Sequence, residues 1–342
     1  MEEKNWLNNT RFTKTVLMIL VILCHAADFW TGNWFTKNPI IQNNTIGIMA
    51  EIIGSFHIYC FVLVSGYVFY YKYSNGEYSK YGVFIKTKIK RLIIPYIFAS
   101  IIWVIPIACF FFKYNKIQIF RNFVLAEAPN QLWFLWMLFG VFAIYWPLSN
   151  FFQYKNILGV ILVISFFGLG TIGDYLFPNV FQIWTAFKYI LFFWTGTKIR
   201  QYENEYMYRY GILAFAVFVF FFIVRQILLL KFDGILYSIT NIGLGLLINV
   251  FGAIGAFVTL QIISERVKWK DNSIFTLLAS KTMPMYLFHQ QIIYFIIFYL
   301  NGRLNPWIHV GISFLVSTVL SLMISIILGH FRITSMLIGD KI

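Results

Sequence analysis

The chain is short of charge. Only 12% of its 342 residues are Asp, Glu, Lys or Arg, whereas about 25% of the residues of a soluble domain are charged. Hydrophobic residues make up 60% of the chain, and apolar runs longer than about 18 residues recur along its whole length. One water-facing globule cannot bury that much apolar surface, so the composition excludes a soluble domain and predicts that the bilayer acts as the solvent.

Cysteine is scarce as well. The three cysteines, Cys24, Cys60 and Cys109, lie inside apolar runs and show neither a disulfide framework nor the spacing of a zinc site. We therefore expect no metal. The sequence also shows no internal repeat of about 20–50 residues and no matched pair of helices broken by Gly or Pro. This absence argues against a typical secondary transporter.

What the sequence does contain is a series of apolar runs separated by polar segments. Each run is long enough to cross a hydrocarbon core of about 30 Å at about 1.5 Å per residue, and only helices satisfy the backbone of such runs in lipid. We predict an all-α, polytopic membrane bundle of about ten transmembrane helices. Because the connections are short, residues 1–342 are expected to form a single membrane-embedded domain. The predicted spans are 14–32, 46–71, 92–112, 131–151, 156–174, 180–197, 210–230, 239–263, 273–299 and 307–330.

The placement of the basic residues predicts the orientation. With the N-terminus in the cytoplasm, 18 of the 27 Lys and Arg fall in cytoplasmic segments and 6 in outer segments. The remaining three, Lys188, Arg225 and Lys281, lie within or beside spans. This bias follows the positive-inside rule, so the net charge of +14 needs no nucleic acid partner. The first run resembles a secretory signal, but it continues through Trp30, so we expect an uncleaved helix.

The first span carries two polar residues on one face. Lys14 and His25 are eleven residues apart, which at about 100° per residue is about 20° past three turns. Their axial separation of about 16 Å puts Lys14 at the inner interface and His25 near the middle of the bilayer. This pair suits a ligand with an anionic head and a reactive far end, such as acyl-CoA. A neutral His accepts the proton of an attacking hydroxyl or takes the acyl group itself. A snorkelling Lys and a His bonded to neighbouring helices fit the same spacing.

Five motifs follow one another over residues 14–289. They are Lys14 with His25 eleven residues later; the aromatic stretch 56–67 ending in Ser65-Gly66-Tyr67; Lys90-Arg91 before Ile94-Pro95-Tyr96; Pro129 before Leu132-Trp133-Phe134-Leu135; and Tyr286-Leu287-Phe288-His289. Together these motifs resemble the acyltransferase-3 family of membrane O-acyltransferases, and most closely its polysaccharide and fucose O-acetylase-like members. Lys14 stands where many members carry Arg, so the positive charge is kept but the guanidinium that binds an anion through two nitrogens is lost.

The resemblance implies that the single domain is an acyltransferase domain. It would move an acyl group, usually acetyl, from cytoplasmic acetyl-CoA to a hydroxyl of a cell-envelope saccharide or a lipid-linked glycan. His25 would carry catalysis, and Lys14, Lys90 and Arg91 would bind acyl-CoA. The expected partners are acyl-CoA, the glycan and the lipid bilayer, and the expected location is the plasma membrane, as a multi-pass protein. The sugar, the hydroxyl, the acyl chain and the oligomeric state are not specified by the sequence.

Residues near the donor motifs have two interpretations each. The basic cluster just before the third predicted span fits CoA phosphates, and it also fits topology setting and contact with anionic lipid. Its members are Lys86, Lys88, Lys90 and Arg91. Ser65, beside Gly66, marks either close helix packing or an opening for a pantetheine arm.

Several further residues are candidates to contact or support the acceptor. Asp28, three residues beyond His25, either orients that ring or lies in the outer headgroup region. Arg225 either binds an anionic acceptor or pairs with Glu51. Glu127 and Trp133 suit a sugar platform or an interfacial belt, and His289 either bridges helices or takes part in the chemistry.

A transporter or flippase of a lipid-linked sugar or small anion is the alternative function. It would use Arg225, Lys188 and Glu51 as coupling charges. A sensor or scaffold is a third class, and it predicts no dependence on His25.

Overall fold

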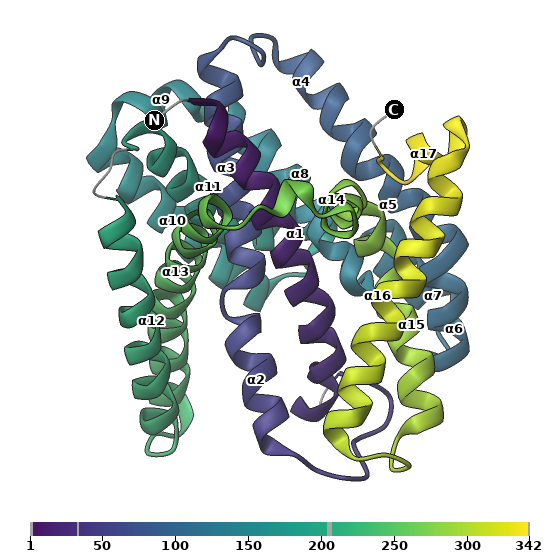
Figure 1. Cartoon of the computed structure of the whole chain (residues 1–342). Coiled ribbons are helices and arrows are strands. Elements are labelled where there is room, and N and C mark those ends of the chain that lie inside the picture. Colours follow the sequence, from purple (N-terminus) through teal and green to yellow (C-terminus); the bar gives the residue numbers. More distant parts are fainter. Residues whose placement is uncertain (1–2, 33, 204–206, 341–342) are drawn as a thin grey trace.

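The computed structural model describes residues 3–32, 34–203 and 207–340, which form helices and loops without a strand. Figure 1 shows a bundle of long helices with the first and last helices of the chain beginning and ending at the same end of the molecule. Within the described residues, nine helical segments are long and apolar enough to cross a membrane. The all-α polytopic bundle predicted from the sequence is therefore confirmed.

The helices follow the predicted order of apolar runs. The longer ones are α1 (Glu3–Ala27), α2 (Asn44–Gly54), α3 (His57–Ser74), α8 (Trp133–Tyr145), α10 (Asn156–Leu176), α11 (Ile183–Gln201), α12 (Met207–Leu229), α13 (Gly234–Arg266), α15 (Thr282–Leu300) and α16 (Pro306–His330). The shorter ones are α4 (Tyr81–Lys88), α5 (Ile94–Ala99), α6 (Ile105–Phe112), α7 (Lys116–Ile119), α9 (Ser149–Tyr154), α14 (Ser273–Ser280) and α17 (Arg332–Leu337).

The sixth predicted span, 180–197, forms α11, which is not among these nine segments. This helix has the required length, but it carries three basic residues, Lys188, Lys198 and Arg200. It packs against α3, α8 and α10, and its central residues are buried. Because α11 faces protein on several sides, it needs fewer lipid-compatible side chains than an outer helix does.

Two predicted spans are interrupted. The run 46–71 breaks at Ser55 and Phe56, so that α2 and α3 follow each other with a kink. The run 273–299 was predicted as one span, but the structure divides it at Lys281 into α14 and α15. A continuous apolar run gives no sign of such breaks, because tertiary contacts decide where the chain turns.

The run 92–112 begins earlier in the structure, at Tyr81. Two π-helical turns, Ile89–Ile93 and Ser100–Val104, interrupt it. Each turn is followed by a proline, Pro95 or Pro106, at the start of the next α-helical segment. A proline lacks the N–H that would continue the α-helical ladder, so a widened turn before it accommodates the missing bond.

The helices α3 and α11 cross at close range. A Cβ added at Gly66 would lie 2.0 Å from the Phe193 carbonyl oxygen, and one added at Gly196 would lie 1.9 Å from the Leu63 oxygen. Small residues allow backbones to approach in this way within a membrane. Gly66 is thus a packing residue, and the neighbouring Ser65 is held beside this crossing.

Gly66→Ala is therefore expected to destabilise the protein by about 3 kcal/mol or more, because the added methyl meets backbone that cannot move aside. The matched control is Gly311→Ala on α16, where nothing lies within 4 Å of the added Cβ. Thermal unfolding of the two purified variants in the same detergent measures the difference. Equal midpoints for both variants would contradict the close crossing.

Candidate functional site

A large cavity opens among α1, α3, α4, α8 and the α14–α15 junction. Its volume is about 960 Å³, near the upper end of the range for small-molecule pockets. Among the described residues that line it, Asp340 is the sole carboxylate, and its Oδ2 lies 2.5 Å from Lys281 Nζ. We call it the basic cavity after its cationic lining residues, which are Arg11, Lys14, Lys72, Lys88, Arg91 and Lys281. Such a concentration of positive charge attracts anions.

One face of α1 forms a wall of the basic cavity from Thr10 to His25. Thr10, Lys14, Met18, Val21 and His25 all line it. Their spacings of four, four, three and four residues place them in one row on a helix. The structure thus brings Lys14 and His25 into the wall of the same cavity.

His25 lies at the end of α1, where the helix gives way to a 3-10 turn that begins at Asp28. His25 Nδ1 is 3.3 Å from Asp28 Oδ2, an ion-pair distance without hydrogen-bond alignment. The two side chains are 18% and 20% exposed, respectively, so both remain accessible. A carboxylate beside Nδ1 favours a proton on that nitrogen, and Nε2 is then the ring nitrogen that accepts a proton.

Two rings hold the imidazole of His25. The ring of His289 has its centroid 5.2 Å away, and that of Trp34 lies at 5.7 Å. His289 is fully buried, and its Nδ1 donates to the carbonyl oxygens of Met285 at 3.2 Å and Tyr286 at 2.9 Å. Its Nε2 has no hydrogen-bond partner among the described residues. His289 therefore combines a hydrogen bond within its own helix with direct contact to His25.

Hydrogen bonds join the segment that leads into α8 to α15 in the wall of the basic cavity. The side chains of Gln131 and Gln291 bond to each other at 2.7 and 2.9 Å, and Gln131 Nε2 also donates to the Leu287 carbonyl. Tyr286 donates its hydroxyl to the Gln131 carbonyl. Trp133, two residues later, lines the cavity. These bonds fix the part of the cavity wall that α8 and α15 form.

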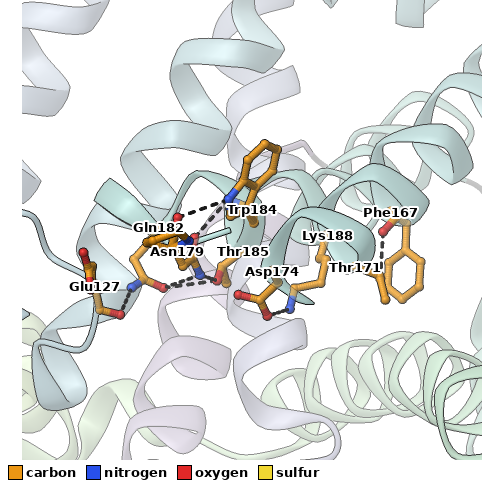
Figure 2. A network of polar contacts seen from close by, with 10 residues as sticks. Glu127, Phe167, Thr171, Asp174, Asn179, Gln182, Trp184, Thr185 and Lys188 are labelled. Atoms are coloured by element: carbon orange, nitrogen blue, oxygen red, sulfur yellow. Dashed lines mark hydrogen bonds and ion pairs between the residues drawn. The ribbon is translucent and has the colours of Figure 1, made fainter. Parts of the chain in front are cut away.

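The loop before α8 is held from α11. Gln182 Nε2 donates to the Ala126 carbonyl at 2.7 Å and to the Glu127 carbonyl at 2.9 Å, and Asn179 and Thr185 complete the network in Figure 2. The Glu127 carboxylate pairs with Arg121 at 2.7 Å, and this hydrogen bond raises the pKa of the Arg121 guanidinium. Glu127 thus contributes to loop structure and lines neither cavity described here.

The cationic residues of the 86–91 cluster separate in the structure. Arg91 lines the basic cavity, whereas Lys90 is exposed and does not line it. Lys88 lines the cavity although it is 9% exposed, and its Nζ lies 3.8 Å from the ring centroid of Phe142 and 5.0 Å from that of Phe84. Aromatic faces stabilise a partly desolvated cation.

Ser65 also lines the cavity, and its hydroxyl donates to the Phe61 carbonyl at 2.9 Å.

Arg225 and Asp28 line a second, smaller cavity. The Arg225 guanidinium donates from two nitrogens to Asn241 Oδ1 at 2.8 and 2.9 Å. Glu51 accepts a bond from Gln226 Nε2 at 3.0 Å. Arg225 and Glu51 therefore bond to different partners in this structure, although both line the same cavity.

Sequence reasoning did not select Lys281 or Arg11 for the site, and it considered Lys88 only as one member of the basic cluster that could hold CoA phosphates. Lys88 carried a weak signal, because it precedes Arg91 by three residues and can share a helix side with it. Lys281 interrupts an apolar run and lies at the junction of α14 and α15, whose residues line the cavity. The deep position of His289 beside His25 required the tertiary structure.

The fold defines a multi-pass membrane protein in which one cavity connects a cluster of cations to an accessible imidazole. A family model described as an acyltransferase domain matches residues 6–326. The chain belongs to the acyltransferase-3 family and is a membrane acyltransferase, as its ordered motifs predicted. A comparison with curated proteins and with solved structures found no match.

Proposed function

We propose that the protein is an O-acyltransferase of the plasma membrane. It takes an acetyl group from cytoplasmic acetyl-CoA and places it on a hydroxyl of an envelope saccharide or lipid-linked glycan. The observation that supports this proposal is the basic cavity, whose wall contains both the cluster of cations and His25. Membership of the acyltransferase-3 family supports the reaction class.

The cations of the basic cavity suit the phosphates of CoA. Arg91 offers a planar fork that binds phosphate oxygens in pairs, whereas Lys14 and Lys88 act as point charges. From Lys14 to His25 the helix rises about 16 Å, a distance that an extended pantetheine arm can bridge. The thioester would then lie beside His25 while the phosphates remain among the cations.

The transfer is a nucleophilic acyl substitution at the thioester carbon. The acceptor hydroxyl oxygen attacks that carbon while His25 Nε2 takes the hydroxyl proton. A C–O bond forms, the C–S bond breaks, and the leaving thiolate takes the proton back from the imidazolium. Acetyl-CoA and an alcohol thus become an acetyl ester and CoA thiol, with no other reactant.

Asp28 and His289 would position the base. The Asp28 carboxylate, 3.3 Å from His25 Nδ1, stabilises the imidazolium that forms during transfer. The ring of His289 packs against the other side of the site. Holding both reactants at one fixed imidazole lowers the entropic part of the barrier.

The test uses inverted membrane vesicles from cells with and without the protein. Acetyl-CoA with a radioactive acetyl group is added to the exposed cytoplasmic face, and label in the extracted glycan fraction is counted. We expect label only where the protein is present, because it joins the donor to the acceptor. Equal labelling of both preparations would refute acyl transfer. Protein-dependent movement of unlabelled glycan to the luminal face of the vesicles would instead favour the flippase.

A further inference from the structure

The second cavity has a volume of about 330 Å³ and lies where the end of α1 meets α2, α3, α12 and α13. The α12–α13 pair stands beside α2 in the half of the bundle away from the chain ends (Figure 1). The residues that line the cavity are Asp28, Thr31, Ala50, Glu51, Gly54, Ser55, Tyr59, Arg225, Gly245, Ile248 and Asn249.

Each of the two cavities is lined by one member of the His25–Asp28 pair. His25 lines the basic cavity and Asp28 lines the second cavity, and their side-chain atoms are 3.3 Å apart. The accessible imidazole and the accessible carboxylate therefore face two separate spaces. A molecule bound in the second cavity beside Asp28 would therefore lie close to His25, the imidazole that lines the basic cavity.

The lining of the second cavity differs in charge from that of the basic cavity. It holds two carboxylates, Asp28 and Glu51, against one cation, Arg225. Arg225 already gives two of its donors to Asn241. The net negative charge of this lining disfavours a polyanion such as CoA. Its carboxylates can instead accept hydrogen bonds from the hydroxyl groups of a ligand.

The other lining groups suit a sugar. Tyr59 supplies an aromatic ring, and Asn249 supplies an amide that both donates and accepts hydrogen bonds. The hydroxyls of Ser55 and Thr31 donate to the backbone carbonyls of Ile52 and Asp28, so they offer acceptor oxygens to the hydroxyls of a ligand. A volume of about 330 Å³ lies at the low end of ligand pockets, which fits a single sugar ring. The groups available match a neutral, hydroxyl-rich ring.

From these observations we infer that the second cavity is the acceptor site, where one neutral sugar residue places a hydroxyl next to the His25–Asp28 pair. This inference rests on the proposed acyl transfer. It assigns Glu51, Arg225 and Asn249 to recognition of the acceptor and separates them from the donor-binding cations. Glu127 and Trp133 do not belong to this site, since Trp133 lines the basic cavity and Glu127 lines neither.

Two glycines of α13 provide a matched test. Nothing lies within 4 Å of a Cβ added at Gly243 or at Gly245, so neither substitution meets a backbone clash. Gly245 lines the second cavity and Gly243 does not. Leu at position 245 would occupy the space of the sugar, whereas Leu at position 243 leaves that space open.

The experiment compares Gly245→Leu and Gly243→Leu in cells and as purified protein in nanodiscs. The first readout is ester-linked acetate on the cell's own envelope glycan, and the second is the Kd of acetyl-CoA. We expect Gly245→Leu to lose glycan acetate by about tenfold or more while the Kd stays within about twofold of wild type. Gly243→Leu should match wild type in both readouts. Glu51→Gln, which keeps the shape of the side chain, should also lower glycan acetate without changing the Kd.

The outcomes separate this inference from the proposed function. Wild-type cells without protein-dependent glycan acetate would refute the acyl transfer itself. Wild-type acetylation that persists fully in Gly245→Leu and Glu51→Gln would overturn the acceptor site alone. Loss of acetyl-CoA binding in a folded Gly245→Leu protein would also overturn it, because the second cavity would then serve the donor.

Discussion

Replacing His25 by Ala is expected to lower the rate of acetyl transfer by about 10²–10⁴-fold, the usual contribution of a general base. His25 is the accessible imidazole in the wall of the basic cavity, and its removal leaves the acceptor hydroxyl to attack without losing its proton. Purified protein in nanodiscs, supplied with acetyl-CoA and extracted glycan, gives the rate from CoA release. The acetyl-CoA Kd should stay near the wild-type value, because the phosphate-binding cations remain.

The matched control is His330→Ala, which removes an exposed histidine at the end of α16. That variant should transfer acetyl at the wild-type rate. A His25→Ala protein that is folded, binds acetyl-CoA and turns over as fast as the control would remove His25 from the chemistry. A loss of transfer accompanied by a loss of acetyl-CoA binding would assign His25 to donor binding instead.

Arg91→Ala is expected to raise the KM for acetyl-CoA by about tenfold to 100-fold, since a hydrogen bond to a charged group contributes about 1.5–3 kcal/mol. The maximal rate should change little, because the phosphates are remote from the reacting carbon. Lys88→Ala should act in the same direction, and both effects should shrink as ionic strength rises. Steady-state kinetics at two salt concentrations measures these changes.

Lys90→Ala provides the comparison for Arg91→Ala. It removes the same unit of charge one residue away, from a side chain that is exposed and outside the basic cavity. The geometry predicts a KM near wild type for Lys90→Ala. If Lys90→Ala raised the KM and Arg91→Ala and Lys88→Ala did not, the donor would bind outside this cavity.

The span pattern was predictable because lipid imposes one simple requirement, a long apolar helix, at every crossing. The shared face of Lys14 and His25 was predictable for a similar reason, since it depends only on helical periodicity. Both inferences use local geometry. The structure places both residues in the wall of one cavity.

The remaining features depend on contacts between distant segments. The break between helices α14 and α15 at Lys281 depends on packing among α1, α14 and α15, and so does the approach of His289 to His25. No local sequence pattern encodes this packing. The π-helical turn Ile89–Ile93 begins directly after Lys88 and contains Lys90 and Arg91, so the regular α-helical spacing does not predict which of these side chains lines the cavity. The second cavity combines α1, α2, α3, α12 and α13, so its position required the folded bundle.

A structure of the protein in a lipid nanodisc with acetyl-CoA bound tests the central claim most directly. The predicted result places the phosphates among Lys14, Lys88 and Arg91. It also leaves room for a hydroxyl that donates to His25 Nε2, with its oxygen about 3–4 Å from the thioester carbon. An acetyl-CoA bound elsewhere, or a His25 ring turned outward into lipid, would contradict acyl transfer at this imidazole.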